Sequence, residues 1–471
     1  RASRPTLPSD PPERPSRATL PSDPPDRACR ATLPTGLLNP IPPQPESPPR
    51  HPSVAPGDSA RHRGGSVCRG PPPKRNSTTE MWVDALSEQT WLEDAADAAI
   101  EKIRARCPQG PDVVFAFWTH DGPAAPLAAR LSRAFPEATR VGAKARGVLA
   151  EGREVEGTPA LALLVGSLET NFAAAPAVQA AHLPPAPSLD EAVEQARKMT
   201  GWIGPASTLV VLAEPHSTPV EPLLRALDLA APEAVKVGGL ASGALAADRP
   251  SLLLQDRLLT EGAVVLSLGR QPAETVVAQG CRPIGEPSVV LRHRGPVIEE
   301  LSHGRPGAVL AELYASLPAS DQALFRHSLF AGIEMKDQRA YGPGDFLIRN
   351  ILGVDRSTQH MVVGADVRQF QALQFHLRDR EAARSELTDA MSRLRQVRAT
   401  TPAAGLLFTC LGRGRGLYGT PNAESEMVRT LAPELPLAGF FCNGEIGPIG
   451  GQTFLHGYTA TGAFFYSDEG T

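Results

Sequence analysis

The sequence has few cysteines, no long apolar run and, in its first 80 residues, no aromatic side chain. The six cysteines, at positions 29, 68, 107, 281, 410 and 442, form no C-x-x-C pair, which argues against a zinc site and a disulfide framework. Such thiols are typical of a reducing compartment, so we expect a cytoplasmic protein. No stretch reaches the roughly 18 consecutive apolar residues of a membrane-spanning helix, so no membrane span is expected.

Residues 1–80 differ in composition from the rest of the chain. They hold 20 of the 48 prolines and none of the 24 aromatic residues, and "TLPSDPP" occurs in them twice, 13 residues apart. A segment with so little apolar surface cannot offset the entropy cost of folding, so a disordered low-complexity tail is predicted. We expect the folded part to start at Met81, which opens the first helix, with Ser87 beginning the helical run that follows.

Charge and motifs exclude several function classes. Residues 81–471 carry 35 Lys and Arg against 44 Asp and Glu, so the basic face that nucleic-acid binding needs is not indicated and no nucleic-acid partner is expected. A P-loop, a dinucleotide-binding fingerprint and a G-x-S-x-G nucleophile motif are all absent from the sequence. We therefore expect no metal, no cofactor and no enzymatic activity.

The clearest internal signal is a repeat. Residues 113–150 align without a gap to 209–246, and 16 of the 38 aligned positions are identical. A third, weaker copy near the C-terminus shares Pro-Glu and two glycines with them. Each copy is predicted to form a strand, a helix, a strand and a strand, the helix ending at Pro-Glu because proline cannot continue it. The two full units cover 113–168 and 209–268.

This pattern predicts a mixed α+β fold, in which tandem β-α-β-β units form layered sheets flanked by helices. Two further helices are predicted from their N-terminal residues. Ser188 begins a capping box with Glu191, and Asp379 is placed to cap the helix that follows it.

The copies also separate structural from functional positions. Shared glycines are structural candidates, because glycine permits a positive φ or a close backbone approach. Where the third copy has Glu445, the others have Val148 and Ala244. The repeat tolerates an apolar residue there, so Glu445 is the first functional candidate, with Cys442 and Asn443 beside it. The structural glycines predicted are Gly142, Gly147, Gly238, Gly243, Gly439 and Gly444.

Three other stretches place charged side chains among glycines or in apolar runs. "CLGRGRGLYG" precedes a helix, so backbone N–H groups and two arginines outline an anion or carboxylate pocket; a solvated loop fits this stretch equally well. "GDFLIRNILGVD" and "LQFHLRD" are strand-like, and they place Arg349 and His376 respectively in apolar surroundings. Each of these two residues could bind a ligand or have a purely structural role. The candidate ligand-binding residues here are Arg413, Arg415, Arg349 and His376.

Together these motifs resemble the FIST family, whose name abbreviates F-box and intracellular signal transduction proteins. The likeness runs from about residue 111 to 466, and "VGGLASGAL", "GCRPIGEP", "LIRNILGVD", "LLFTCLGRGRGLYG" and "FFCNGEIGP" carry it in that order. The resemblance implies an N-terminal FIST domain, which we place at 81–278 after the tail 1–80, and a C-terminal one at 279–471.

The resemblance further implies an intracellular sensory protein that binds a small ligand, an amino acid or a related metabolite. Arg413 and Arg415 would then hold a carboxylate and Glu445 an ammonium group. Two alternatives stay open. One is a protein-interaction module that recruits substrates, through a protein partner, for a ubiquitin ligase or signalling machinery. The other is a hydrolase that uses Cys442 or Glu445 with His456.

Overall fold

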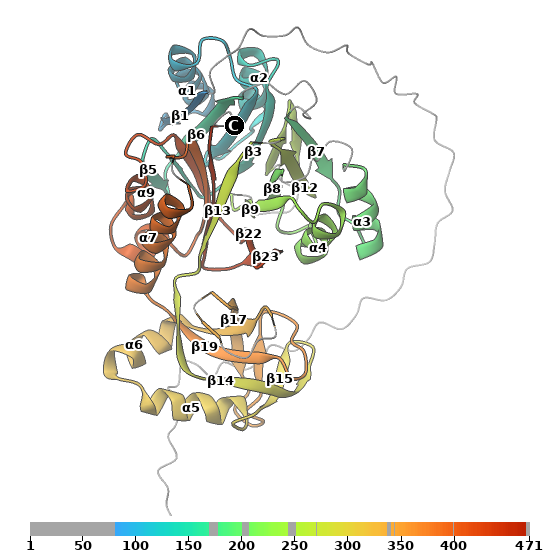
Figure 1. The fold of residues 1–471 in the computed structure, drawn as a ribbon, viewed down its shortest axis with the longest axis vertical. Coiled ribbons are helices and arrows are strands. Elements are labelled where there is room, and N and C mark those ends of the chain that lie inside the picture. The colour runs from blue at the N-terminus through green and yellow to red at the C-terminus, as the bar shows by residue number, and fades with distance from the viewer. Residues whose placement is uncertain are drawn as a thin grey trace, which may run out of the picture.

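The computed structural model describes residues 81–168, 178–199, 207–243, 251–269, 271–336, 341–342, 344–398 and 400–467. The tail predicted at 1–80 lies outside these residues. The described part forms three six-stranded sheets and one closed six-stranded barrel, with helices on the outer faces (Figure 1). The fold is therefore mixed αβ with layered sheets and flanking helices.

The first sheet has the strand order β1, β6, β2, β3, β10, β11, and the second β23, β22, β9, β8, β12, β7. The first is built from β1 (Met81–Ser87), β6 (Leu161–Ser167), β2 (Val113–Trp118), β3 (Thr139–Lys144), β10 (Leu252–Leu254) and β11 (Arg257–Leu259). The second is built from β23 (Gln452–His456), β22 (Glu445–Ile449), β9 (Val235–Leu240), β8 (Thr208–Ala213), β12 (Ala263–Ser267) and β7 (Gln179–Leu183).

The third sheet has the order β13, β24, β20, β21, β4, β5, and the barrel runs β14, β15, β18, β17, β16, β19. The third sheet consists of β13 (Ala273–Ala278), β24 (Ala460–Phe465), β20 (Ala404–Cys410), β21 (Leu437–Cys442), β4 (Gly147–Ala150) and β5 (Arg153–Glu156). The barrel consists of β14 (Cys281–Arg294), β15 (Val297–Leu301), β18 (Met361–Val363), β17 (Phe346–Val354), β16 (Leu329–Glu334) and β19 (Ala372–Arg378).

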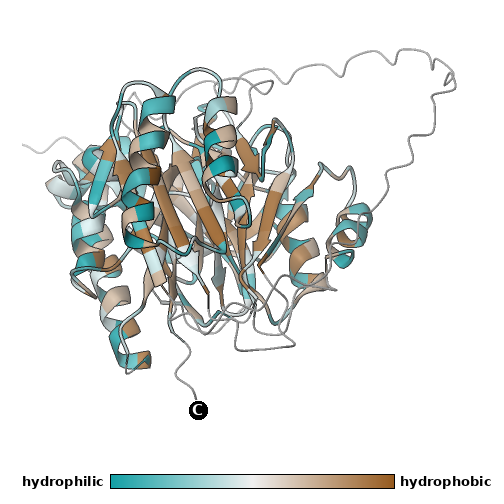
Figure 2. Cartoon of the chain, turned by 90° about the horizontal axis from the view of Figure 1, so that it is seen from above, coloured by the Kyte–Doolittle hydropathy of each residue, from teal (hydrophilic) through white to brown (hydrophobic). Residues whose placement is uncertain are grey.

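Helices cover the outside of each sheet, while the three inner faces share one apolar core that contains Phe117, Val237 and Phe440. Figure 2 shows this arrangement, with apolar strands inside and helices whose polar faces point outward. The first sheet is covered by α1 (Leu92–Arg106) and α2 (Ala125–Ala134), and the second by α3 (Leu189–Arg197) and α4 (Val220–Ala230). The third is covered by α7 (Arg380–Val397), α8 (Gly414–Tyr418) and α9 (Ala423–Arg429), and the barrel carries α5 (Pro306–Ser316) and α6 (Ala319–Ser328).

Each sheet contains one parallel strand pair whose connection includes a helix. These pairs are β2 with β3, β8 with β9, and β20 with β21. The order strand, helix, strand, strand therefore recurs, although its origin by duplication stays a prediction. The structural repeat is shifted by one residue relative to the gapless sequence alignment. Gly142 of β3 pairs with Ala116 of β2, and Gly238 of β9 pairs with Val211 of β8. Strands β2 and β8 are therefore offset by 95 residues, whereas β3 and β9 are offset by 96.

The hairpin that follows each parallel pair leaves its own sheet and joins the next one. Strands β4 and β5 extend the third sheet beside β21, β10 and β11 extend the first beside β3, and β22 and β23 extend the second beside β9. The three sheets thus close into a ring. We call the points where the chain passes from one sheet to the next the crossings. They meet at Ser242, whose hydroxyl accepts the N–H of Arg146 at 3.0 Å and donates to the carbonyl of Phe441.

The ring crosses the boundary predicted between 278 and 279, because strands after residue 379 pair with strands before 278. The barrel is the segment enclosed between them, from Cys281 to Arg378. The division into 81–278 and 279–471 stays a prediction about sequence regions. Among the described helices, none combines the length and the apolar character needed to cross a bilayer.

The helix expected to open at Met81 is wrong. Residues 81–87 form β1, which pairs over its full length with β6, and Trp82 stacks on Phe465 at 5.0 Å between ring centroids. This pairing and packing override the helical pattern, and α1 begins only at Leu92. The caps at Ser188 and Asp379 are confirmed, because their side chains accept backbone N–H groups of α3 and α7.

Glycine at position 439 is required by a close backbone approach. A Cβ there would lie 1.7 Å from the carbonyl oxygen of Leu407 on the neighbouring parallel strand. The equivalent contacts at Gly142 and Gly238 are 2.1 and 1.9 Å. The three parallel pairs therefore share one steric constraint.

We predict that Gly439→Ala lowers the free energy of unfolding by about 3 kcal/mol or more, because backbone must move to admit the methyl group. The control is Gly416→Ala in α8, where no atom lies within 4 Å of the added Cβ, and which should leave stability equal or slightly raised. Thermal unfolding of both variants measures the difference. Equal melting temperatures for the two variants would contradict the constraint.

Candidate functional site

The motifs in the second half of the chain meet where the barrel faces the loops of the sheets. The hydroxyl of Tyr458 donates to Asn350 Oδ1 of the barrel at 2.7 Å, and its ring lies 4.2 Å from that of Phe330. Arg378 stacks over the same ring at 5.2 Å and donates to the carbonyl of Gly412 at 3.1 Å. We call this contact between barrel and sheets the junction.

Glu445 begins β22 beside the junction and is fully buried. Its Oε2 accepts the N–H of Thr459 at 3.1 Å, its Oε1 makes no hydrogen bond among the described residues, and the thiol of Cys410 lies close to the carboxyl group. Burial raises the pKa of this carboxyl well above its usual range, which favours its neutral form.

His456 lies directly opposite Glu445 in the β22–β23 ladder, so the two side chains share one face. Its Nε2 contacts the carbonyl of Gly447 at 3.1 Å, and its buried Nδ1 has no partner among the described residues. Burial lowers the pKa of His456 to about 4, and the charge of Arg349 adds to this shift. The imidazole is therefore neutral at pH 7.

Arg349 reaches the same place from β17 of the barrel. Its side chain is only 11% exposed, and one amino group lies 3.6 Å from Glu221 of α4, which is 70% exposed. Its other described contact is a hydrogen bond of 3.1 Å to the carbonyl of Ile348 on its own strand. This guanidinium therefore keeps donor capacity that its protein partners leave unused.

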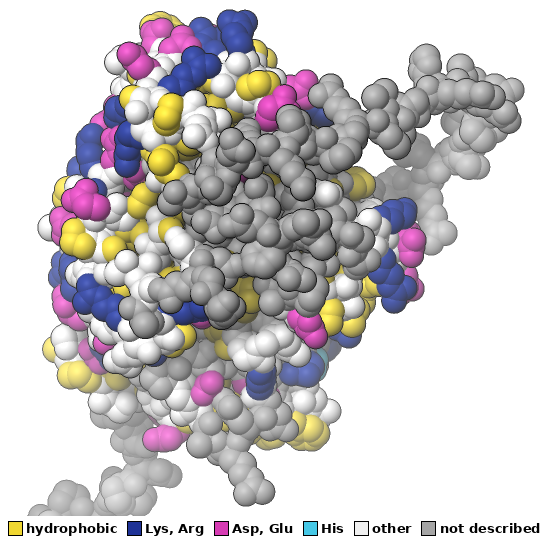
Figure 3. Space-filling model, turned by 45° about the horizontal axis from the view of Figure 1, so that its top comes forward, with side chains coloured by type: hydrophobic (Ala, Val, Ile, Leu, Met, Phe, Trp, Pro, Cys, Tyr) yellow, Lys and Arg dark blue, Asp and Glu magenta, His cyan; other side chains and the backbone are white. Residues whose placement is uncertain are grey.

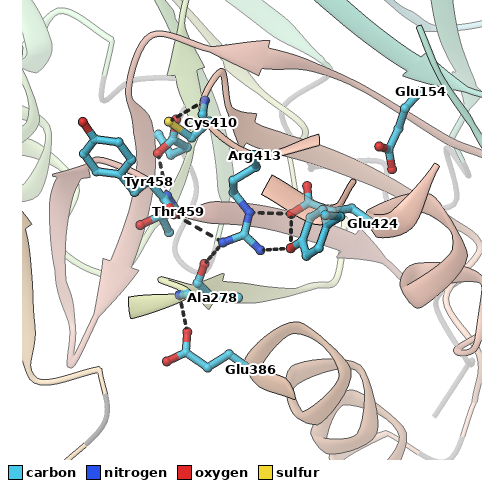
Figure 4. Close-up of polar contacts among 12 residues, drawn as sticks. Glu154, Ala278, Glu386, Cys410, Arg413, Glu424, Tyr458 and Thr459 are labelled. Atoms are coloured by element: carbon cyan, nitrogen blue, oxygen red, sulfur yellow. Dashed lines mark hydrogen bonds and ion pairs between the residues drawn. The ribbon is translucent and has the colours of Figure 1, made fainter. Parts of the chain in front are cut away.

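Arg413 has a different environment, shown in Figure 4. It is fully buried, forms an ion pair with Glu424, and donates to the hydroxyl of Tyr418 at 2.7 Å. It also donates to the carbonyls of Ala278 and Tyr458 at 3.2 and 3.3 Å. Arg413 thus ties the start of α8 to the end of β13 and to the turn between β23 and β24, and in this conformation its donors are engaged by the protein.

Acidic groups outnumber the cation in this interior. Glu154 of β5 accepts the N–H of Ser425 at 2.7 Å, and burial with the neighbouring Glu424 raises the pKa of Glu154 to about 7. Glu386 of α7 accepts the N–H of Gly280 at 2.6 Å, and burial raises its pKa as well. One buried arginine cannot neutralise all these carboxyls, so some of them hold protons near neutral pH.

The other predicted residues are dispersed. Arg415 and Asn443 have exposed side chains, and the backbone N–H of Arg415 donates to Glu156 at 2.9 Å. Cys442 is buried, and burial raises the pKa of its thiol well above the usual value. His376 is buried on the outer face of the barrel, directly opposite Phe330 in the β16–β19 ladder, and its ring lies 5.5 Å from that of Phe346. The structure thus places Glu445 opposite His456; the charge of Arg413 acts on Glu445 and that of Arg349 on His456.

Sequence reasoning missed the acid partners of Arg413 and the bridging role of Tyr458. Glu424 follows Arg413 by 11 residues, across a turn at Gly419 with a φ of 76°, so no helical spacing links them. Glu154 comes from the first repeat unit and could be placed only once the strand exchange is known. No group of three or more His, Cys, Asp or Glu side chains in the described residues is arranged to hold a metal ion.

Comparison with known proteins places the chain in a family. The FIST N domain matches residues 112–304 and the FIST C domain matches residues 308–448. A similar protein from Mycobacterium tuberculosis, described as uncharacterized, is 34% identical over 351 residues, which cover 74% of this chain and 88% of that protein. The chain belongs to the FIST domain family, which is associated with signal transduction.

Two eukaryotic proteins are similar over shorter stretches. An F-box/LRR-repeat protein of Arabidopsis thaliana is 31% identical over 116 residues, 21% of this chain and 22% of that protein. F-box only protein 22 of Pongo abelii is 43% identical over 60 residues, 12% of this chain and 15% of that protein.

We predict that Glu154→Gln weakens the pH dependence of stability. The folded state raises the pKa of Glu154 from 4.5 to about 7, so it binds a proton that the unfolded state has released between those values. The contribution of this group to stability is present below pH 4.5 and is lost as the pH rises through 7. Between pH 5 and pH 8, the melting temperature of the variant should therefore fall by less than that of the parent.

The control for this measurement is Glu101→Gln, which changes an exposed carboxyl on α1. It should leave the pH profile of the melting temperature as in the parent. A Glu154→Gln profile parallel to that of the parent would show that this carboxyl titrates normally.

Proposed function

We propose that this protein is a sensory protein that binds a small ligand at the junction. The observation that carries the proposal is the convergence of Arg349, His456 and Glu445. Each is largely or fully buried, and each keeps a polar group that its protein partners leave unused. Buried polar groups are normally satisfied, so a set of unsatisfied ones in one place favours an external partner.

The charges of these groups favour a ligand with a carboxylate, such as an amino acid or a related metabolite. Arg349 is suited to a carboxylate, because its guanidinium has spare donors and its one acidic partner, 3.6 Å away, is largely exposed to solvent. Arg413 is less suited, since Glu424 already neutralises it. Glu445 would then receive an ammonium group, whose charge would favour ionisation of a carboxyl that burial holds at a raised pKa.

Ligand entry requires movement, because Glu445 and His456 are no more than 2% exposed. Glu445 and His456 belong to the ring of sheets and Arg349 to the barrel, so a ligand that joins them would change how the barrel sits on the sheets. Such a change is the kind of response a sensory protein needs. We further propose a cytoplasmic location, supported by cysteines that form no disulfide among the described residues.

The two alternatives find different support. A thiol hydrolase is disfavoured, because burial raises the pKa of Cys410 to about 12 and holds that of Cys442 high as well, which keeps both thiols protonated. A protein-recruiting role is favoured by the two relatives with F-box names, although each covers a small part of this chain.

Figure 3 shows basic and acidic side chains interspersed on the described part of one face, which offers no basic patch for nucleic acid.

A thermal-shift screen of the full chain against amino acids, small carboxylates and nucleotides tests the proposal. A ligand at ~100 times its dissociation constant stabilises the folded state by about 2.7 kcal/mol. We expect one class to raise the melting temperature, and Arg349→Gln and Glu445→Gln to abolish the shift.

The matched control is Arg225→Gln, which changes an exposed arginine on α4, the helix that also carries Glu221. It should retain the shift. If no class raises the melting temperature, or if Arg349→Gln and Glu445→Gln respond as the parent does, the proposed site is wrong.

A further inference from the structure

The three exchanged hairpins differ in how their outer edge is covered. In a two-residue hairpin, the second residue of the returning strand points its N–H away from its partner strand. These residues are Thr453 in β23, Glu154 in β5 and Leu258 in β11. Because all three strands are sheet edges, each of these N–H groups needs an acceptor from elsewhere.

In the second sheet, a carboxylate of the covering helix supplies the acceptor. Asp228 of α4 accepts the N–H of Thr453 at 2.9 Å and its hydroxyl at 2.7 Å. The same carboxylate pairs with the buried Lys236 at 3.0 Å, whose ammonium group also donates to the carbonyl of Ala231 at 2.6 Å. One acid thus closes the edge strand and neutralises a buried cation.

In the third sheet an amide does the same for the edge strand. The N–H of Glu154 donates to the side-chain oxygen of Asn422 at 2.8 Å. Both of these hairpins therefore have their outward N–H satisfied from within the chain.

In the first sheet, the described residues offer no such acceptor. At the repeat offset of 96, Ser132 of α2 stands in the place of Asp228, and Arg140 in the place of Lys236. Arg140 repeats the anchoring contact of Lys236, since it donates to the carbonyl of Phe135 at 2.6 Å. Within the described residues, no ion pair reaches Arg140 and no acceptor reaches the N–H of Leu258.

Arg140 is nevertheless almost fully buried. It is 6% exposed, and its Nε has no hydrogen-bond partner among the described residues. Burial lowers its pKa, and the charges of Asp256 and Glu137 counteract this only in part. A buried guanidinium without a paired acid is costly, so this position would gain from an external carboxylate.

A groove open to solvent lies where the missing contact would be. Its volume is about 460 Å³, and small apolar side chains of α2 form one wall while β11 and the preceding turn form the other. The lining residues are Ala125, Ala128, Ala129, Ser132, Arg133, Asp256 and Leu258.

We propose that this groove docks an extended acidic segment of a partner protein, whose Asp or Glu side chain takes the place that Asp228 fills in the second sheet. The carboxylate accepts the N–H of Leu258 and pairs with Arg140, while Arg133 offsets the negative charge of Asp256, which also lines the groove. The occupant is a peptide segment because the groove runs beside an unpaired strand edge, to which an extended chain can add main-chain hydrogen bonds. A groove this open would bury too little of a small molecule.

The first arm of the test supplies the carboxylate from within the chain. Amide hydrogen exchange of Leu258 is measured in the full-length parent, in Ser132→Asp and in the control Ser132→Asn. We expect at least tenfold slower exchange in Ser132→Asp than in Ser132→Asn. Two results would overturn the claim that the N–H of Leu258 lacks the acceptor that Asp228 provides for Thr453. One is an amide of Leu258 that is already as protected in the parent as that of Thr453. The other is an exchange rate of Leu258 that Ser132→Asp leaves unchanged.

The second arm measures binding. Two random heptapeptide libraries, one with a fixed central Asp and one with a fixed central Asn, are panned against the parent, Ser132→Asp and Ser132→Asn. We expect enrichment only from the Asp library, on the parent and on Ser132→Asn, and its loss on Ser132→Asp. Enrichment that is equal for both libraries, that survives in Ser132→Asp, or that is absent from every pool would overturn the proposal.

Discussion

Each sheet is completed by a hairpin that comes from another repeat unit, and the rest of the molecule depends on this exchange. The chain must cross between sheets at three places that meet around Ser242. At this crossing only a residue without a side chain fits, as at Gly243, whose Cβ would lie 2.8 Å from the backbone nitrogen and oxygen of Ala145. The glycines thus belong to the scaffold, and the residues between them are free to differ.

Because the residues between the glycines can differ from one repeat unit to the next, one unit can carry a buried acid that the other two do not have. In sequence, the positions equivalent to Glu445 are Val148 and Ala244, whereas Glu445 itself is a buried acid opposite His456. The barrel then adds Arg349 from the other side. Arg413 keeps its pair with Glu424 and stabilises the interior, so an arginine that looks like a ligand group in sequence is largely structural.

The sequence predicted the order of elements in each unit and the caps at Ser188 and Asp379, because helix periodicity and capping are local properties. It placed a helix at Met81, where pairing with a distant strand decides the outcome. The strand exchange was also out of reach, since a repeat shows which segments are alike but not which of them pair. For the site, Glu445 was found from differences between copies, while its neighbours depend on contacts between remote strands.

Native-state hydrogen exchange across β2, β8 and β20 tests the central claim, that the exchanged hairpins join three sheets into one cooperative ring. If no sheet is complete without another unit, the core amides of all three strands should open with the same free energy and respond equally to denaturant. Opening free energies that differ by several kcal/mol between the strands, with one sheet remaining protected after another has exchanged, would contradict the account.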